Sequence, residues 1–288
     1  MNILTFDIED WFHILDNDST KTAKEWNNYE SRLHNNMERI FSVLERHHVR
    51  ASFFCLGWIA EKHPDIIRTI DKLGYEIGSH SYHHQLVYEQ NKNVFRADVE
   101  KSVKTIEDII GKKVRIYRVP GFSITETTTW AFEILCNMGI EVDSSVFPAH
   151  RAHGGFPSYG KGEPSVFLIN GKSIKEFPIN VYQFLSCNII FSGGGYFRAI
   201  PYSFIKRFSK KSGYIMTYFH PRDFDPDQPN IKGLPLNRKF KSYVGLKSAL
   251  SKLDKYLTDF SFIDIGTAEK EIDWNNVKTF DLTSIHTK

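Results

Sequence analysis

Short β-rich runs alternate with amphipathic segments through the first half of the chain, and this alternation most constrains the fold. The β-rich runs lie at residues 3–6, 51–56, 75–79, 114–117 and 140–143. Between them, apolar residues recur at helical spacing in segments 33–44, 59–73, 99–110 and 130–138. Repeated strand–helix pairs are typical of βα units around a parallel sheet, so the pattern predicts an α/β fold. Glycines are expected to end three of the helices, at Gly74, Gly111 and Gly139.

The regular alternation breaks near Pro148. Residues 148–200 are rich in glycine, proline and aromatic side chains, with short predicted strands at 166–169 and 174–177, so we expect an elaborated loop region. Beyond it, the pattern predicts a helix at 201–211, a strand at 214–219, a loop to about residue 241, a helix at 246–257 and a last strand at 260–265. A chain of 288 residues can form one α/β domain. We therefore expect a single catalytic domain over residues 1–288, with 266–288 as a C-terminal extension.

Charge and hydropathy exclude some classes of protein. Lysine and arginine number 37 against 34 aspartate and glutamate, an excess too small for a dedicated nucleic-acid-binding protein. Two basic clusters, at 206–211 and 238–241, would suit contact with an anionic membrane surface, although a solvated helix face is the commoner reason for such a cluster. The first residues lack the pattern of a secretory signal and no 18-residue apolar run follows, so we expect a cytoplasmic protein.

Ionisable residues gather at the carboxyl ends of the predicted strands. Asp7, Glu9 and Asp10 follow the first strand, and later strands are followed by His80 and His84, by Arg118, by Asp143 and by His220. The carboxyl ends of the strands in an α/β barrel meet at one face, where barrel enzymes hold their active sites. We therefore expect these side chains to form one site.

The spacing of His80 and His84 suits a metal ion. If the segment turns helically, the two imidazoles lie on one face, and with one carboxylate they would leave the ion open to water and substrate. Such a pair could equally lie on an exposed turn and bind nothing. The carboxylates of Asp7, Glu9 and Asp10 repel one another, which indicates a bound cation or a shared proton unless the turn is solvated.

Arg118 and His220 are candidates for positioning and proton transfer. A fixed guanidinium beside a carboxylate base would keep that base oriented and ionised, with a surface ion pair as the alternative for Arg118. An imidazole at the end of an apolar strand could protonate a leaving amine, although a core histidine would give the same pattern at His220.

Four motifs, taken in order, resemble those of the polysaccharide deacetylases, the NodB-homology family of carbohydrate esterases. They are Thr5-Phe6-Asp7, His80-x-x-x-His84, Arg118-x-Pro120 and Phe219-His220-Pro221, so the resemblance spans about residues 3–265. Further segments, among them Asp143-Ser144-Ser145 and Gly193-Gly194-Gly195-Tyr196-Phe197-Arg198, resemble the branch of the family associated with bacterial exopolysaccharide gene clusters.

The resemblance implies a distorted (β/α)7 TIM-like barrel and a divalent metal ion, with zinc as the expected ion. One acidic residue and two histidines, here His80 and His84, would hold the ion. The resemblance also implies that Asp7 is the base, that Arg118 anchors this base and that His220 is the acid. The backbone N–H of Gly121 would stabilise the oxyanion.

This sequence departs from the family pattern at two places. Ile8 stands where the family has its metal-binding aspartate, so the acidic ligand must be Glu9 or Asp10, and we favour Glu9. Many members also have an Asp-Trp pair after the fifth strand that tunes the acid histidine, whereas this chain has Val146-Phe147. The candidates for the residue that tunes His220 are Asp143, Glu176 and Asp223.

Together these residues predict a hydrolase in which metal-activated water removes N-acetyl or O-acetyl groups from a bacterial polysaccharide or its sugar precursor. Its partner would be an N-acetylated glycan or sugar precursor, and not a nucleic acid. Two alternatives remain: a metal-independent amidohydrolase that opens cyclic amides on a similar barrel, and a sugar-binding protein whose site no longer turns over.

Overall fold

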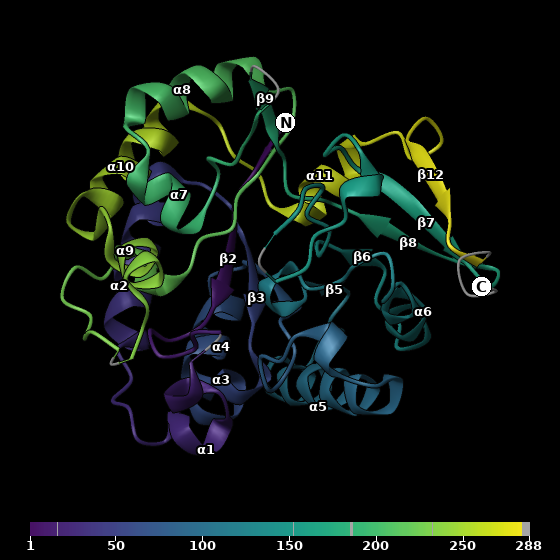
Figure 1. Cartoon of the computed structure of the whole chain (residues 1–288), viewed down its shortest axis with the longest axis horizontal. Coiled ribbons are helices and arrows are strands. Elements are labelled where there is room, and N and C mark those ends of the chain that lie inside the picture. Colours follow the sequence, from purple (N-terminus) through teal and green to yellow (C-terminus); the bar gives the residue numbers. More distant parts are fainter. Residues whose placement is uncertain (16, 152, 185–186, 232, 284–288) are drawn as a thin grey trace. The chain divides into compact units, whose positions relative to one another are not determined.

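The computed structural model describes residues 1–15, 17–151, 153–184, 187–231 and 233–283 (Figure 1). The chain divides into two compact units, each built from segments far apart in the sequence. The first unit comprises Met1–Ser52 and Tyr182–Ile265, and the second comprises Phe53–Val181 and Gly266–Lys288. The expectation of a single catalytic domain stays a prediction.

The second unit is built on a sheet whose strands mostly run parallel. Its strand order is β12-β7-β8-β6-β5-β4-β3. The strands are β3 (Ser52–Cys55, whose first residue belongs to the first unit), β4 (Glu76–Ser79), β5 (Ile116–Tyr117), β6 (Val142–Asp143), β7 (Ser165–Ile169), β8 (Lys172–Glu176) and β12 (Lys278–Asp281). The strands β4, β5, β6 and β8 are successive parallel neighbours, and β12 is parallel to β7, whereas β7 and β8 form an antiparallel hairpin.

Helices of the second unit pack beside this sheet. They are α3 (Gly57–Lys62), α4 (Pro64–Lys72), α5 (Lys92–Ile110), α6 (Trp130–Asn137) and α11 (Ile265–Glu271). The long helix α5 contacts α3, α4, α6 and β4 (Figure 1). Its predicted apolar stripe is confirmed, since Phe95, Val99 and Ile106 are buried. Gly111 ends the helix with φ of 67°, as expected from the sequence.

The first unit combines short strands with six α-helices among its described residues. Its strands are β1 (Asn2–Ile3), β2 (Thr5–Ile8), β9 (Tyr182–Phe184), β10 (Cys187–Ile189) and β11 (Ile215–Met216). The strand β1 is parallel to β11, and a parallel bridge joins Phe6 of β2 to Phe219. The helices are α1 (Ala23–Trp26), α2 (Leu33–His47), α7 (Gly194–Ala199), α8 (Tyr202–Lys211), α9 (Leu236–Tyr243) and α10 (Leu246–Asp259). Contacts join α10 to α2, α7 and α8 (Figure 1).

The structure corrects several of the predicted elements. Residues 59–73 form two helices because Pro64 has no N–H to continue the first one. Within the region 148–200, by contrast, the two short strands predicted at 166–169 and 174–177 are confirmed as β7 and β8, and β8 extends the parallel sheet beside β6. The helices α7 and α9 form where none was predicted, and the predicted strand 260–265 is reduced to one bridge, at Ile263.

Among the described residues, no helix is both long enough and apolar enough to cross a membrane.

Candidate active site

The two predicted metal-binding histidines follow β4 and lie close together. His80 and His84 are buried, and their ring centres are 5.5 Å apart. The segment that joins them is an irregular turn rather than the helical turn expected from the H-x-x-x-H spacing. Ser81 and His84 have φ angles of 64° and 54°, in the left-handed region that residues with a side chain rarely adopt. This turn, and not helical periodicity, brings the two imidazoles together.

Asp98, on α5, holds this turn. Its carboxylate accepts hydrogen bonds from the backbone N–H groups of Tyr82 (2.8 Å) and His83 (2.9 Å). The hydroxyl of Ser81 accepts another from the N–H of His84 (3.0 Å). Burial raises the pKa of the Asp98 carboxyl, and the two backbone hydrogen bonds act against that rise. Strained backbone persists only where its surroundings impose it, and these hydrogen bonds do so here.

Sequence reasoning missed Asp98, although a signal for it was present. The residue is buried on the same face of α5 as Phe95, Val99 and Ile106. A carboxylate is seldom buried on an apolar stripe unless polar groups surround it. Its position on the stripe therefore indicated nearby N–H groups that need an acceptor.

A hydrogen bond of its own fixes the ring of His80. Its Nδ1 lies 2.7 Å from the carbonyl oxygen of Arg118. Because a carbonyl oxygen can only accept, Nδ1 carries the proton, and a neutral ring keeps its lone pair on Nε2. A metal-binding histidine needs that arrangement, in which the second nitrogen is anchored by an acceptor.

Arg118 is fully buried at the end of β5. It donates from Nε to the carbonyl oxygen of Ser144 (3.1 Å) and from Nη2 to the hydroxyl of the same residue (2.9 Å). Its guanidinium also lies over the ring of Phe54, 4.2 Å from the ring centre. This burial excludes the surface ion pair that was the alternative interpretation of Arg118. Its role as anchor of Asp7 stays a proposal.

The segment that leads to Gly121 rests on the end of β6. The N–H of Val119 donates to the Ser145 hydroxyl (2.9 Å), which donates in turn to the Asp143 carboxylate (2.7 Å). Gly121 itself has φ of 63° and ψ of 10°, a left-handed conformation that glycine adopts without steric cost.

Two of the three candidates for tuning His220 are partners on neighbouring strands. Asp143 of β6 lies opposite Glu176 of β8, and both are fully buried. Burial raises the pKa of both carboxyls, and the negative charge of Asp143 raises that of Glu176 further. Glu176 accepts a hydrogen bond from the N–H of Val146 (3.0 Å). We therefore assign these two carboxyls a structural role at the ends of β6 and β8.

Asp7 and His220 end neighbouring segments of the first unit. The N–H of Asp7 donates to the carbonyl oxygen of Phe219 (2.7 Å), which sets the two segments side by side. Asp7 and Glu9 are buried, whereas the side chain of His220 is 23% exposed, so a ligand can reach its ring. Nε2 of His220 lies 3.9 Å from a carboxylate oxygen of Asp7.

The third candidate, Asp223, contacts His220 directly. Its Oδ2 accepts a hydrogen bond from the backbone N–H of His220 (2.9 Å) and lies 3.0 Å from Nδ1 of the ring. Burial alone would lower the pKa of the imidazole, but this hydrogen bond and the charges of Glu9, Asp223 and Asp7 raise the pKa to about 9. Burial would raise the pKa of the Asp223 carboxyl, but Arg198 and His220 lower it to about 2. The pair is therefore ionic at neutral pH.

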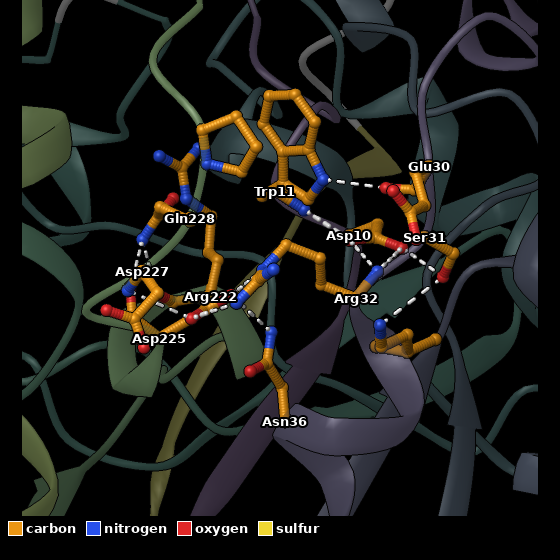
Figure 2. A network of polar contacts seen from close by, with 12 residues as sticks. Asp10, Trp11, Glu30, Ser31, Arg32, Asn36, Arg222, Asp225, Asp227 and Gln228 are labelled. Atoms are coloured by element: carbon orange, nitrogen blue, oxygen red, sulfur yellow. Dashed lines mark hydrogen bonds and ion pairs between the residues drawn. The ribbon is translucent and has the colours of Figure 1, made fainter.

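Asp10 belongs to another network, at the start of α2 (Figure 2). Its carboxylate accepts hydrogen bonds from the N–H groups of Trp11 (2.8 Å) and Arg32 (3.2 Å) and from the hydroxyl of Ser31. Arg32 is the residue before the first turn of α2, so the carboxylate lies at the positive end of the helix dipole. The oxygens of Asp10 are thus engaged in structural hydrogen bonds, which weakens its candidacy as a metal ligand.

Comparison with protein families identifies two regions of the chain. Residues 4–141 match the model of the polysaccharide deacetylase family, and residues 144–269 match a domain of unknown function, DUF3473. Among curated proteins, the peptidoglycan-N-acetylglucosamine deacetylase of Bacillus cereus is 33% identical over 96 residues. That match covers 33% of this chain and only 35% of the relative.

Two solved structures share the fold. One, described as a candidate polysaccharide deacetylase from Mycobacterium smegmatis, has a TM-score of 0.65 and 16% identity and covers 96% of this chain and 91% of its own. The other, a carbohydrate esterase family 4 pseudoenzyme from Bacillus anthracis, has a TM-score of 0.51 and 12% identity, with coverage of 97% and 69%. These likenesses confirm the predicted α/β fold class, the distorted TIM-like barrel of the deacetylases. The match over residues 4–141 shows that this part of the chain is a polysaccharide deacetylase domain.

Proposed function

We propose that this protein is a metal-dependent deacetylase that hydrolyses the acetamido group of an N-acetylated glycan or sugar precursor. The proposal is carried by the carboxylate and imidazole at the ends of two neighbouring segments, where His220 Nε2 lies 3.9 Å from Asp7. Hydrolysis of an amide needs a base that takes a proton from water and an acid that protonates the leaving amine. This pair supplies both groups, and the match of residues 4–141 to the polysaccharide deacetylase family supports an acetylated sugar as the substrate.

We propose that the metal ion is zinc and that its ligands are Glu9, His80 and His84. Each of the three is buried and offers one ligand atom. Two imidazoles and one carboxylate are a donor set of catalytic zinc, which keeps a further position for water. When bound, such an ion lowers the pKa of water from about 15.7 to ~7 and polarises a carbonyl group. We leave Asp10 out of the ligand set because its oxygens accept hydrogen bonds at the start of α2.

Each remaining residue has a part in moving or balancing charge. Asp7 takes a proton from the attacking water, and the guanidinium of Arg118 is the proposed anchor of this carboxylate. The N–H of Gly121 donates a hydrogen bond to the oxyanion. His220 then gives the proton on Nε2 to the departing amine, whose C–N bond breaks.

The sugar is proposed at the level of its class. The Bacillus cereus relative is named for peptidoglycan N-acetylglucosamine, but only 35% of that relative is matched. For this chain we propose an N-acetylated glycan of exopolysaccharide assembly, in the form of a cytoplasmic precursor.

Contact with an anionic membrane surface is a further part of the proposal. On α9, Leu236 is 85% and Phe240 is 65% exposed, and Lys239 and Lys241 are exposed beside them. Apolar and basic side chains together are typical of a helix that lies on a membrane surface. Sedimentation with vesicles of anionic phospholipid tests this, and loss of protein from the pellet in the double variant Leu236→Ser, Phe240→Ser is the expected result.

Acetate release tests the enzymatic proposal. Purified protein is incubated with N-acetylated oligosaccharides before and after removal of metal by a chelator, and again after zinc is returned. We expect activity that follows the metal and is absent from His80→Ala. Activity that survives both metal removal and His80→Ala would indicate the metal-independent amidohydrolase. Tight glycan binding without acetate would indicate the sugar-binding protein, a real alternative because a pseudoenzyme shares this fold.

A further inference from the structure

A buried arginine contacts Asp223, the hydrogen-bond partner of His220. Arg198, the last charged residue of α7, donates from Nε to Oδ1 of Asp223 (2.9 Å), whose Oδ2 faces His220. The side chains of Arg198 and Asp223 are 4% and 3% exposed. The three residues therefore form a chain of charged groups that leads from the interior to a partly exposed imidazole.

The side chain of Arg198 is held in one position by backbone carbonyl groups. Its two Nη atoms donate to the carbonyl oxygens at the end of α9, those of Lys241 (2.9 Å), Ser242 (3.1 Å) and Val244 (2.7 Å). A planar guanidinium whose two Nη atoms are both hydrogen-bonded has one orientation. Its Nε–H bond thus points at a fixed place, and Asp223 is held there.

The glycine run before Arg198 allows this placement. A Cβ atom on Gly193 would lie 2.3 Å from the carbonyl oxygen of Tyr218, and one on Gly195 would lie 2.8 Å from that of Lys241. No side chain fits at such distances, so only glycine lets α7 approach both backbones. The run Gly193-Gly194-Gly195, conspicuous in the sequence, therefore has a structural task, which is to bring Arg198 to Asp223.

We propose that Arg198 and Asp223 are positioning residues of the acid, in which Arg198 fixes Asp223 and Asp223 holds the proton on Nδ1 of His220. The Nε2 atom is then the one that faces Asp7 and delivers the proton. Asp223, from the turn that follows His220 itself, takes the place of the Asp-Trp pair that this chain lacks after its fifth strand. The inference rests on the proposed function, because it assigns these residues to the acid of the deacetylation.

Asp223→Asn tests the inference at the level of the ring. In this variant the amide oxygen is drawn to Arg198, so the amide NH₂ faces His220 and can no longer accept the Nδ1–H bond. The proton then moves to Nε2 in the neutral ring, and the wrong tautomer results, as in the matching change to a catalytic triad. We expect the ¹⁵N signal of His220 Nδ1, assigned with His220→Gln, to move to the range of an unprotonated nitrogen at the same pH.

Kinetics and a matched variant complete the test. We expect kcat of Asp223→Asn to fall by ~10²–10⁴-fold, as for loss of a general acid, with KM and bound metal unchanged. Arg198→Lys keeps a charge but loses the forked geometry, and kcat should fall by about 10–100-fold. Lys252→Met is the control, because among the described residues the hydrogen bonds of Lys252 go to carbonyl oxygens of α7 and the residue after it, at 2.9 Å each. It should lower stability without moving the Nδ1 signal or kcat.

Either of two results would overturn the inference. One is an unchanged Nδ1 signal in Asp223→Asn, whatever its activity. The other is a loss of kcat in Lys252→Met as large as in Arg198→Lys, since the effect would then be a general loosening of α7. The nitrogen signal does not depend on turnover, so a wild-type protein that releases no acetate would refute the proposed function and still leave this part measurable.

Discussion

Asp10→Asn should lower the stability of the protein and leave metal binding unchanged. Glu9→Gln should weaken metal binding and leave the stability of the metal-free protein unchanged. The Asp10 carboxylate accepts hydrogen bonds from Trp11, Ser31 and Arg32, and it is only 1% exposed. An asparagine keeps one accepting oxygen and turns an NH₂ group toward the other donors. At least one buried N–H is then left without an acceptor.

The size of the effect follows from these contacts. A buried donor without an acceptor costs about 1–3 kcal/mol. Loss of a negative charge at the first turn of α2 adds about 0.3–1 kcal/mol. The sum is about 1–4 kcal/mol, which corresponds to a fall in melting temperature of roughly 2–4 °C per kcal/mol in a chain approaching this size. Asp10→Asn should therefore melt about 3–16 °C below the wild type, by the same estimates.

Two measurements on each variant separate the roles of the two carboxylates. Thermal unfolding in a chelator reports stability without metal, and metal analysis after dialysis against zinc reports the site. We expect Asp10→Asn to melt early and bind one ion, and Glu9→Gln to melt like the wild type in chelator and bind little. An Asp10→Asn protein of wild-type stability that loses its metal would refute the reasoning and make Asp10 the ligand.

Two further variants probe the second unit. Asp98→Asn should weaken zinc binding by about 10–100-fold, because an amide can accept only one of the two N–H bonds that hold the turn between the histidines; titration with zinc measures this, and the exposed Asp108→Asn on the same helix is the control. Glu176→Gln should unfold at higher urea than the wild type at alkaline pH, with a difference that closes below about pH 4.5. Burial raises the folded-state pKa of Glu176, so its contribution to stability is complete below the unfolded pKa and is lost as pH rises. An equal urea midpoint at every pH would contradict this.

Much of the fold was predictable because it depends on local periodicity. Each apolar stripe that recurs at helical spacing needs one buried face, and α2, α5 and α10 lie where their stripes are. The candidate site residues were nominated for a related reason, since polar residues that follow parallel strands lie at the strand ends. The sequence could therefore nominate Asp7, His80, Arg118 and His220 without any long-range contact being known.

The partners of those residues were not predictable in the same way. Asp98 holds the histidine turn from 15 or 16 residues away, and Arg198 reaches Asp223 across 25. Periodicity places Asp98 on the buried face of α5, but it does not identify the partner, because the pairing depends on how a helix packs beside a strand end. The helical turn that was the condition for bringing His80 and His84 together does not form, for the same reason: Asp98 makes a left-handed turn stable where local propensity disfavours one.

Each acidic residue near Asp7 and His220 has its own hydrogen-bond partners, and these different partners explain why several acidic residues lie there. Asp223 faces His220 and Arg198, while Asp225, two residues on, accepts hydrogen bonds from Arg32 (3.0 Å from Nη2) and Asn36 (3.3 Å) (Figure 2). Asp10 binds the backbone of the same Arg32. The start of α2 thus ties down both the segment after Asp7 and the turn after His220. The proposed base and acid, 3.9 Å apart, must keep their separation to within a fraction of an ångström, and carboxylates fixed on one helix start provide that rigidity.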